Sequence, residues 1–175
     1  MHTLRFLAIA CLFAGLSTLA PSVSSQQTIV DPAALIVLTG APSEQAAADN
    51  LCRSLGSRRV VSLAGQTTLR ELLTLYSLAD VLVTNDSGPG HFASLTPVHA
   101  IVLFGPETPR LFGPLAPATT VIWKELACSP CVSVFNHRLS PCRNNVCMQS
   151  ITVDEVFEAV RAVVSDGASQ PRGIP

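Results

Sequence analysis

The residues best suited to chemistry lie in the octapeptide TNDSGPGH at positions 84–91. An apolar, β-branched run at residues 79–83 precedes it and is typical of a buried parallel strand, whereas residues 92–95 after it favour a helix. A turn from a strand into a helix N-terminus presents unpaired backbone N–H groups and a partial positive charge. This arrangement suits an anion, above all a phosphate.

Several residues of this turn fit a phosphate site. Gly88 and Gly90 allow positive φ and a close approach of the backbone to a ligand. His91 would project from the first helical turn, where its ring can donate a hydrogen bond to a phosphate oxygen. An ordinary strand-to-helix turn capped by Asp86 or Ser87 explains the same spacing, and spacing alone does not choose between the two interpretations.

The elements that position this turn alternate between strands and helices. This alternation predicts an α/β fold with a Rossmann-like, doubly wound parallel sheet and flanking helices. A helix that begins after Thr68 is indicated by a capping box with Glu71, and Ser43 is a plausible N-cap of an earlier helix. Strands are expected at residues 35–39, 60–63, 79–83, 99–104 and 119–123, and a terminal helix at residues 153–164.

Polar residues follow three of the expected strands. Glu44, Thr67 and Asp86 would all face one crevice, because open parallel sheets bind ligands at the carboxyl ends of their strands. An acid in the first turn of a helix also complements the helix dipole, so the sequence leaves two interpretations of Glu44 open.

Composition and charge exclude some classes of partner. The chain of 175 residues is long enough for one α/β domain with a substantial core. Its net charge is −1, and it has no run of Lys or Arg, which argues against nucleic acid as a partner.

Residues 1–27 differ in character from the rest. Arg5 precedes an apolar run at 6–16, and a small-residue stretch follows at 21–25. This is the order of a signal peptide, and the run is short for a membrane span of about 20 residues. An export signal, a short membrane anchor and the arbitrary start of a truncated gene remain open. The expected organisation is a signal-like or anchor-like leader at 1–27, a ligand-binding domain at 28–165 and a flexible tail at 166–175.

The chain has six cysteines, four of which lie close together in the sequence. Cys128 and Cys131 have CxxC spacing, and Cys142 and Cys147 follow. Four such thiols could hold zinc, could form two disulfides if the chain is exported, or could be ordinary unpaired thiols. Short cysteine spacings do not decide among these three.

Several motifs together resemble one known family. They are GAPSE at 40–44, LAGQTTL at 63–69, NDSGPGH at 85–91 and LFGPETP at 103–109, followed by the late cysteines and the helix that begins near 151. In this order they resemble the C-terminal, donor-binding half of glycosyltransferase family 9, the ADP-heptose:lipopolysaccharide heptosyltransferases. The resemblance covers roughly residues 35–164.

The resemblance implies a GT-B architecture, in which a nucleoside-diphosphate sugar binds between two Rossmann-like domains, and an inverting, metal-independent transfer without a further cofactor. The diphosphate would lie on the turn with Ser87, Gly88 and His91, held by the amides near Ser87 and Gly88. Asp86 would hold the turn or the sugar hydroxyls, and Glu44 would contact the nucleoside ribose. The family implies a lipopolysaccharide-type or other glycan acceptor.

The chain also departs from the family pattern. No counterpart of the N-terminal domain is found, and in the family that domain supplies the acceptor site, the general base and a basic phosphate contact. The catalytic residue is therefore unknown, and a separate N-terminal acceptor-binding domain is an expected partner. A non-catalytic exported or remnant nucleotide-binding domain is the alternative. The family implies a location in the cytoplasm or at the cytoplasmic face of the inner membrane, whereas the leader leaves export and membrane association open.

Overall fold

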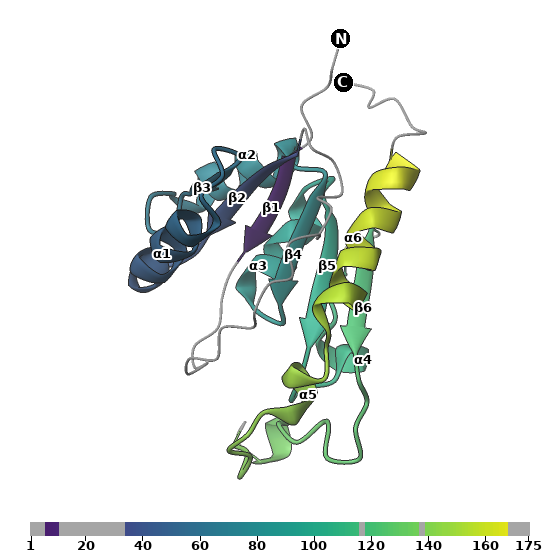
Figure 1. Ribbon diagram of the computed structural model, residues 1–175. Helices are drawn as coiled ribbons and strands as arrows, with labels where there is room; N and C mark the ends of the chain where they lie inside the picture. Colours follow the sequence, from purple (N-terminus) through teal and green to yellow (C-terminus); the bar gives the residue numbers. More distant parts are fainter. Residues whose placement is uncertain (1–5, 11–33, 116–117, 137–138, 168–175) are drawn as a thin grey trace.

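The protein is built around one parallel sheet, seen in a computed structural model that describes residues 6–10, 34–115, 118–136 and 139–167. The six strands lie in the order β3-β2-β1-β4-β5-β6, and every pairing is parallel (Figure 1). This confirms the predicted doubly wound sheet. The strands are β1 (Phe6–Ala10), β2 (Leu35–Thr39), β3 (Val60–Ser62), β4 (Val81–Asn85), β5 (His99–Phe104) and β6 (Thr119–Trp123).

The place of β1 corrects the N-terminal boundary of the domain. Residues 1–27 were expected to stand apart, but β1 lies inside the sheet and pairs with β2 on one side and β4 on the other. A short apolar run is typical both of a signal-peptide core and of a buried parallel strand, so the sequence pattern did not separate them. The domain therefore extends to the N-terminal side of residue 28. The other residues of the expected leader, and the tail from residue 168, lie outside the described residues.

Helices cover both faces of the sheet. In Figure 1, α6 lies in front of β5 and β6, and α2 and α3 lie behind the sheet. Residues of α6 also pack against β4. No helix in the described ranges combines the length and the apolar character needed to span a bilayer. The helices are α1 (Gln45–Leu55), α2 (Leu69–Leu78), α3 (Gly88–Phe92), α4 (Pro109–Phe112), α5 (Val146–Gln149) and α6 (Val153–Gly167), with 3-10 turns η1 (Pro42–Glu44), η2 (Ala93–Leu95) and η3 (Val134–Asn136).

The central strand β5 shows how the two faces are packed. Phe104 is fully buried and belongs to the cluster that contains Tyr76 of α2. Ile101, which has the opposite parity, packs with Val160 of α6. Alternate side chains of a strand point to opposite faces, so β5 is apolar on both faces and its carboxyl end is firmly fixed.

Side-chain capping explains how α2 begins but not how α1 begins. The predicted capping box of α2 is confirmed, since the Thr68 N–H donates to Glu71 Oε2 at 2.8 Å and the Glu71 N–H donates to Thr68 Oγ1 at 3.3 Å. The expectation that Ser43 caps α1 is wrong, because Ser43 lies within η1 and Glu44 occupies the N-cap position. The Glu44 carboxylate instead accepts the N–H of Ala41 at 2.7 Å.

Candidate functional site

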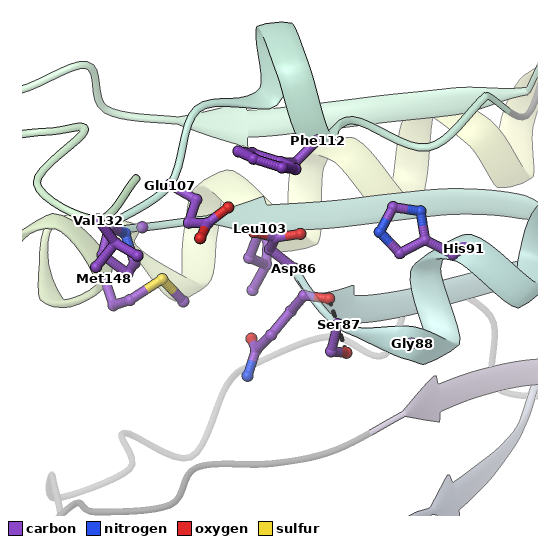
Figure 2. Close-up of a pocket in the computed structure, with 12 residues that line it drawn as sticks. Asp86, Ser87, Gly88, His91, Leu103, Glu107, Phe112, Val132 and Met148 are labelled. Atoms are coloured by element: carbon purple, nitrogen blue, oxygen red, sulfur yellow. Dashed lines mark hydrogen bonds between the residues drawn. The ribbon is translucent and has the colours of Figure 1, made fainter. Parts of the chain in front are cut away.

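An open pocket of about 570 Å³ lies at the carboxyl ends of β4 and β5. The strand order reverses direction between β1 and β4, and open α/β sheets bind ligands beside such a switch point. The turn after β4 and the loop after β5 supply most of the wall, and Val132 and Met148 close it from later in the chain (Figure 2). The turn after β4 contributes Asn85, Asp86, Ser87, Gly88 and His91 to the pocket.

Backbone hydrogen bonds hold the turn after β4 in place. They use some of its N–H groups, so few N–H donors remain for a ligand. The Asp86 N–H donates to the carbonyl oxygen of Leu103 at 3.0 Å, which ties the turn to β5. The Gly90 N–H donates to the carbonyl oxygen of Ser87 at 3.1 Å, and Pro89 has no N–H. Among the first amides of α3, those of Ser87 and Gly88 are therefore the ones suited to an anion in the pocket.

Side-chain capping does not account for this turn. Ser87 occupies the N-cap position of α3 with an extended backbone, but its side chain makes no capping hydrogen bond. The Ser87 hydroxyl donates instead to the carbonyl oxygen of Asn85 at 3.1 Å. The simple capping interpretation of Ser87 is therefore not realised in the structure.

The two glycines of α3 do not adopt the left-handed backbone that the sequence allowed for. The positive-φ glycines in the described part of the chain are Gly56 and Gly65, so the expectation for Gly88 and Gly90 is corrected. Gly90 is buried, and a Cβ atom there would lie 3.5 Å from Thr84 Cγ2. That distance is an ordinary van der Waals contact, so the space at Gly90 does not itself require glycine, and Gly88 is exposed on the pocket wall.

Two titratable side chains expected from the sequence reach the pocket. His91 is exposed and lines it from α3, and Asp86 is half-buried at the end of β4. In Figure 2, Asp86 lies between His91 and Glu107. Asp86, Ser87, Gly88 and His91 thus line one pocket, and their role in binding a ligand stays a prediction.

Other residues that line the pocket were not singled out from the sequence as candidate site residues, among them Glu107, Phe112 and Met148. Glu107 follows β5 and is only 8% exposed, and Phe112 of α4 and Met148 of α5 also line the pocket. Glu107 lies in the LFGPETP motif, so its place after a buried strand was a usable signal. Phe112 and Met148 come from short elements whose position depends on tertiary packing.

Glu44 and Thr67 do not line this pocket. They follow β2 and β3, and β1 separates these two strands from β4. A Cβ atom on Gly40 would lie 2.8 Å from Glu44 Oε2, so the carboxylate folds back over its own loop. A ribose contact by Glu44 and a ligand contact by Thr67 stay predictions.

The pocket wall is acidic. Asp86 and Glu107 line it, and no Lys or Arg is among the described residues that do so. Arg110 of α4 is exposed and pairs with Glu125 at 2.8 Å. Phosphate oxygens in this pocket would therefore depend on neutral donors and on His91.

In the described residues, the cysteines form neither a zinc site nor disulfides, the two bonded arrangements considered from the sequence. Across the described ranges, no three His, Cys, Asp or Glu side chains are placed to hold a metal ion. Cys52, Cys128, Cys131, Cys142 and Cys147 all have free thiols. Cys147 is buried next to the pocket residue Met148, so part of this loop borders the candidate site.

The order of the parallel strands and the helices that flank them define a Rossmann-like α/β domain. The family model of glycosyltransferase family 9 (heptosyltransferase) matches residues 28–139. The chain belongs to this family.

Curated relatives agree with this assignment. The chain is 26% identical to lipooligosaccharide heptosyltransferase 2 of Campylobacter jejuni over 104 residues, which cover 59% of this chain and 32% of the relative. It is 31% identical to lipopolysaccharide heptosyltransferase 2 of Salmonella typhimurium over 90 residues, which cover 50% of this chain and 26% of the relative. The chain thus matches about a third or less of the length of these relatives.

Solved structures share the fold. The structure of E. coli ADP-heptose LPS heptosyltransferase II matches with a TM-score of 0.68 and 20% identity, covering 94% of this chain and 48% of that one. E. coli heptosyltransferase WaaC with ADP matches with a TM-score of 0.59 and 16% identity, covering 91% of this chain and 44% of that one. The fold is that of one Rossmann-like half of a GT-B glycosyltransferase.

Proposed function

We propose that this chain is the donor-binding half of a glycosyltransferase that uses a nucleoside-diphosphate sugar of the ADP-heptose kind and a lipopolysaccharide-type acceptor. The supporting observation is the pocket that gathers Asp86, Ser87, Gly88 and His91 in a chain of glycosyltransferase family 9. Two structural relatives are an ADP-heptose LPS heptosyltransferase and a heptosyltransferase with ADP, both from E. coli. The proposed location is the cytoplasm or the cytoplasmic face of the inner membrane.

The diphosphate binds at the turn after β4. The amides of Ser87 and Gly88 and the ring of His91 donate to its oxygens. Donors fixed before the reaction stabilise the negative charge that grows on the leaving nucleoside diphosphate, which makes it a better leaving group. Because no Lys or Arg is among the described lining residues, a cationic contact from outside them completes the neutralisation.

The carboxylates serve a different part of the donor. Asp86 and Glu107 would repel phosphate oxygens, but a carboxylate accepts hydrogen bonds from hydroxyl groups well. Glu107 is nearly buried, so a sugar hydroxyl that reaches it is sheltered from water. We assign these two side chains to hydroxyl groups of the donor.

The transfer needs a second half that holds the acceptor. In an inverting displacement, the acceptor oxygen attacks the anomeric carbon opposite the departing diphosphate, while a general base removes its proton. We place that base and the acceptor site on a separate N-terminal acceptor-binding domain, which contributes the remaining transition-state contacts.

Replacing His91 with alanine is expected to weaken ADP binding about tenfold, because a hydrogen bond to a charged phosphate is lost. Calorimetric titration of the full chain with ADP measures this change. His99→Gln is the matched control, since His99 lies outside the pocket and contacts Thr120 Oγ1 at 2.8 Å. Equal losses in the two variants, or an unchanged affinity in His91→Ala, would count against a diphosphate at this turn.

Replacing Glu107 with glutamine is expected to separate sugar recognition from diphosphate recognition. The affinity for ADP-heptose should fall about fivefold, because a charge-assisted hydrogen bond becomes a neutral one, whereas ADP affinity stays within twofold. Competition against a fluorescent ADP analogue gives both values, and Glu125→Gln on the exposed pair with Arg110 is the control. Equal losses for ADP and ADP-heptose would contradict a role for Glu107 in sugar binding.

A further inference from the structure

One hydrogen-bonded network contains the thiols of Cys131, Cys142 and Cys147. Ser140 Oγ donates to Cys131 Sγ at 3.1 Å and accepts the Cys142 N–H at 3.1 Å. The Asn145 N–H donates to Cys142 Sγ at 3.3 Å, and the Cys147 thiol donates to Asn145 Oδ1 at 3.4 Å. Ser140 thus connects Cys131 to Cys142, and Asn145 connects Cys142 to Cys147.

The two thiols on either side of Asn145 have unlike surroundings. Cys142 is exposed, and hydrogen bonds from the Asn144 and Asn145 backbone lower the pKa of its thiol. Cys147 is 5% exposed, and burial raises the pKa of its thiol. The thiolate is the reactive form of cysteine, so Cys142 combines access to solvent with greater thiolate character.

We propose that Cys142 is an oxidant-reactive thiol and that Cys147 resolves the product into an intramolecular Cys142–Cys147 disulfide. The oxidant is a low-molecular-weight disulfide. The Cys142 thiolate attacks one of its sulfur atoms, forms a mixed disulfide and releases the first small thiol. The Cys147 thiolate then attacks Cys142 Sγ and releases the second, so the protein loses two hydrogens and the oxidant gains them as two thiols.

The position of Asn145 supports this pairing. Its backbone is left-handed, with φ of 49°, which turns the chain sharply between the two cysteines. Both sulfur atoms meet atoms of this one residue. The buried Cys147 needs no access to solvent, because its target is the sulfur atom of Cys142 and not the free oxidant.

The disulfide would act on the wall of the candidate site. A Cβ atom on Gly105 would lie 2.6 Å from Met148 Sδ and 3.4 Å from Cys147 Sγ. The side chains of α5 therefore pack tightly against Gly105, which lines the pocket. Drawing Cys147 Sγ toward Cys142 therefore shifts Met148, which lines the pocket. Oxidation of the thiol pair is in this way coupled to the shape of the pocket.

The reduced full chain is incubated with oxidised glutathione, alkylated and digested without reductant, and its peptides are identified by mass spectrometry. We expect a Cys142–Cys147 cross-link in the unaltered chain. In Cys147→Ser we expect a glutathione adduct that accumulates on Cys142, and in Cys142→Ser a Cys147 that stays alkylatable. Cys128→Ser is the control and retains the cross-link, because Cys128 is exposed and takes no part in the network.

A glutathione adduct mainly on Cys128, or a Cys128–Cys131 cross-link in the unaltered chain, would overturn the proposal. Stoichiometric metal in the purified chain that blocks alkylation of these thiols would also overturn it. If Cys147→Ser fails to fold, the peptide map of the unaltered chain still decides. No nucleotide is used, so the outcome is independent of the proposed function.

Discussion

Replacing Ala8 with proline is expected to unfold the protein at ambient temperature or to leave it close to its thermal midpoint. Ala8 lies at the centre of β1, opposite Val37 of β2 and Leu82 of β4. Proline has no N–H for the ladder and is found essentially only on edge strands. We expect a loss of about 3 kcal/mol or more, a large share of the stability of a small domain. Thermal unfolding followed by circular dichroism measures this loss.

The conservative control is Ala8→Val, which keeps the backbone donor and is expected to leave the sheet folded. Together, these two variants test whether residues 6–10 form a strand of the sheet or belong to a leader outside the folded domain. If residues 6–10 lay outside the folded domain, the proline variant would melt at the same temperature as the unaltered chain. An unchanged melting temperature would therefore contradict the place of β1 in the sheet.

Replacing Gly88 with aspartate is expected to abolish measurable binding of ADP. Gly88 is exposed on the pocket wall, and a Cβ atom there would meet Phe92 Cε2 at an ordinary distance of 3.5 Å. The new side chain therefore fits but places a negative charge beside the diphosphate. Like charges held together cost several kcal/mol, so we expect a loss of about 100-fold in affinity, measured by calorimetry.

Gly88→Asn is the matched control, since asparagine has nearly the shape of aspartate without the charge. We expect this variant to retain ADP binding within about tenfold of the unaltered chain, well short of the effect of a like charge. Similar losses in the two variants would show that size, not charge, matters at this position. Such a result would remove the support for a phosphate near Gly88.

Much of the fold could be predicted from local pattern. Residues 35–39, 99–104 and 119–123 form strands with the predicted bounds, because each is a short apolar or β-branched run that ends at a turn. The capping box at Thr68 was predictable for the same reason, since its hydrogen bonds join residues three positions apart. The turn at 84–91 was recognised from its spacing between a strand and a helix.

The rest depends on contacts that local pattern does not contain. An apolar run of the same length can be a signal-peptide core or a buried strand, and only pairing with β2 and β4 identifies β1 as a strand. Glu107 joins the pocket because β5 neighbours β4 in the sheet. Glu44 was expected in the same crevice, but β1 separates its strand from β4.

The most direct test is an amide NMR titration of the isotope-labelled full chain with ADP. The central claim is that a nucleoside diphosphate binds at the turn after β4. We predict saturable shifts that are largest at the amides of Ser87 and Gly88 and at the neighbouring His91, with a Kd on the order of 0.1–1 mM for one half of a two-domain site. No shift at saturating ADP, or shifts confined to residues outside the pocket, would contradict the claim.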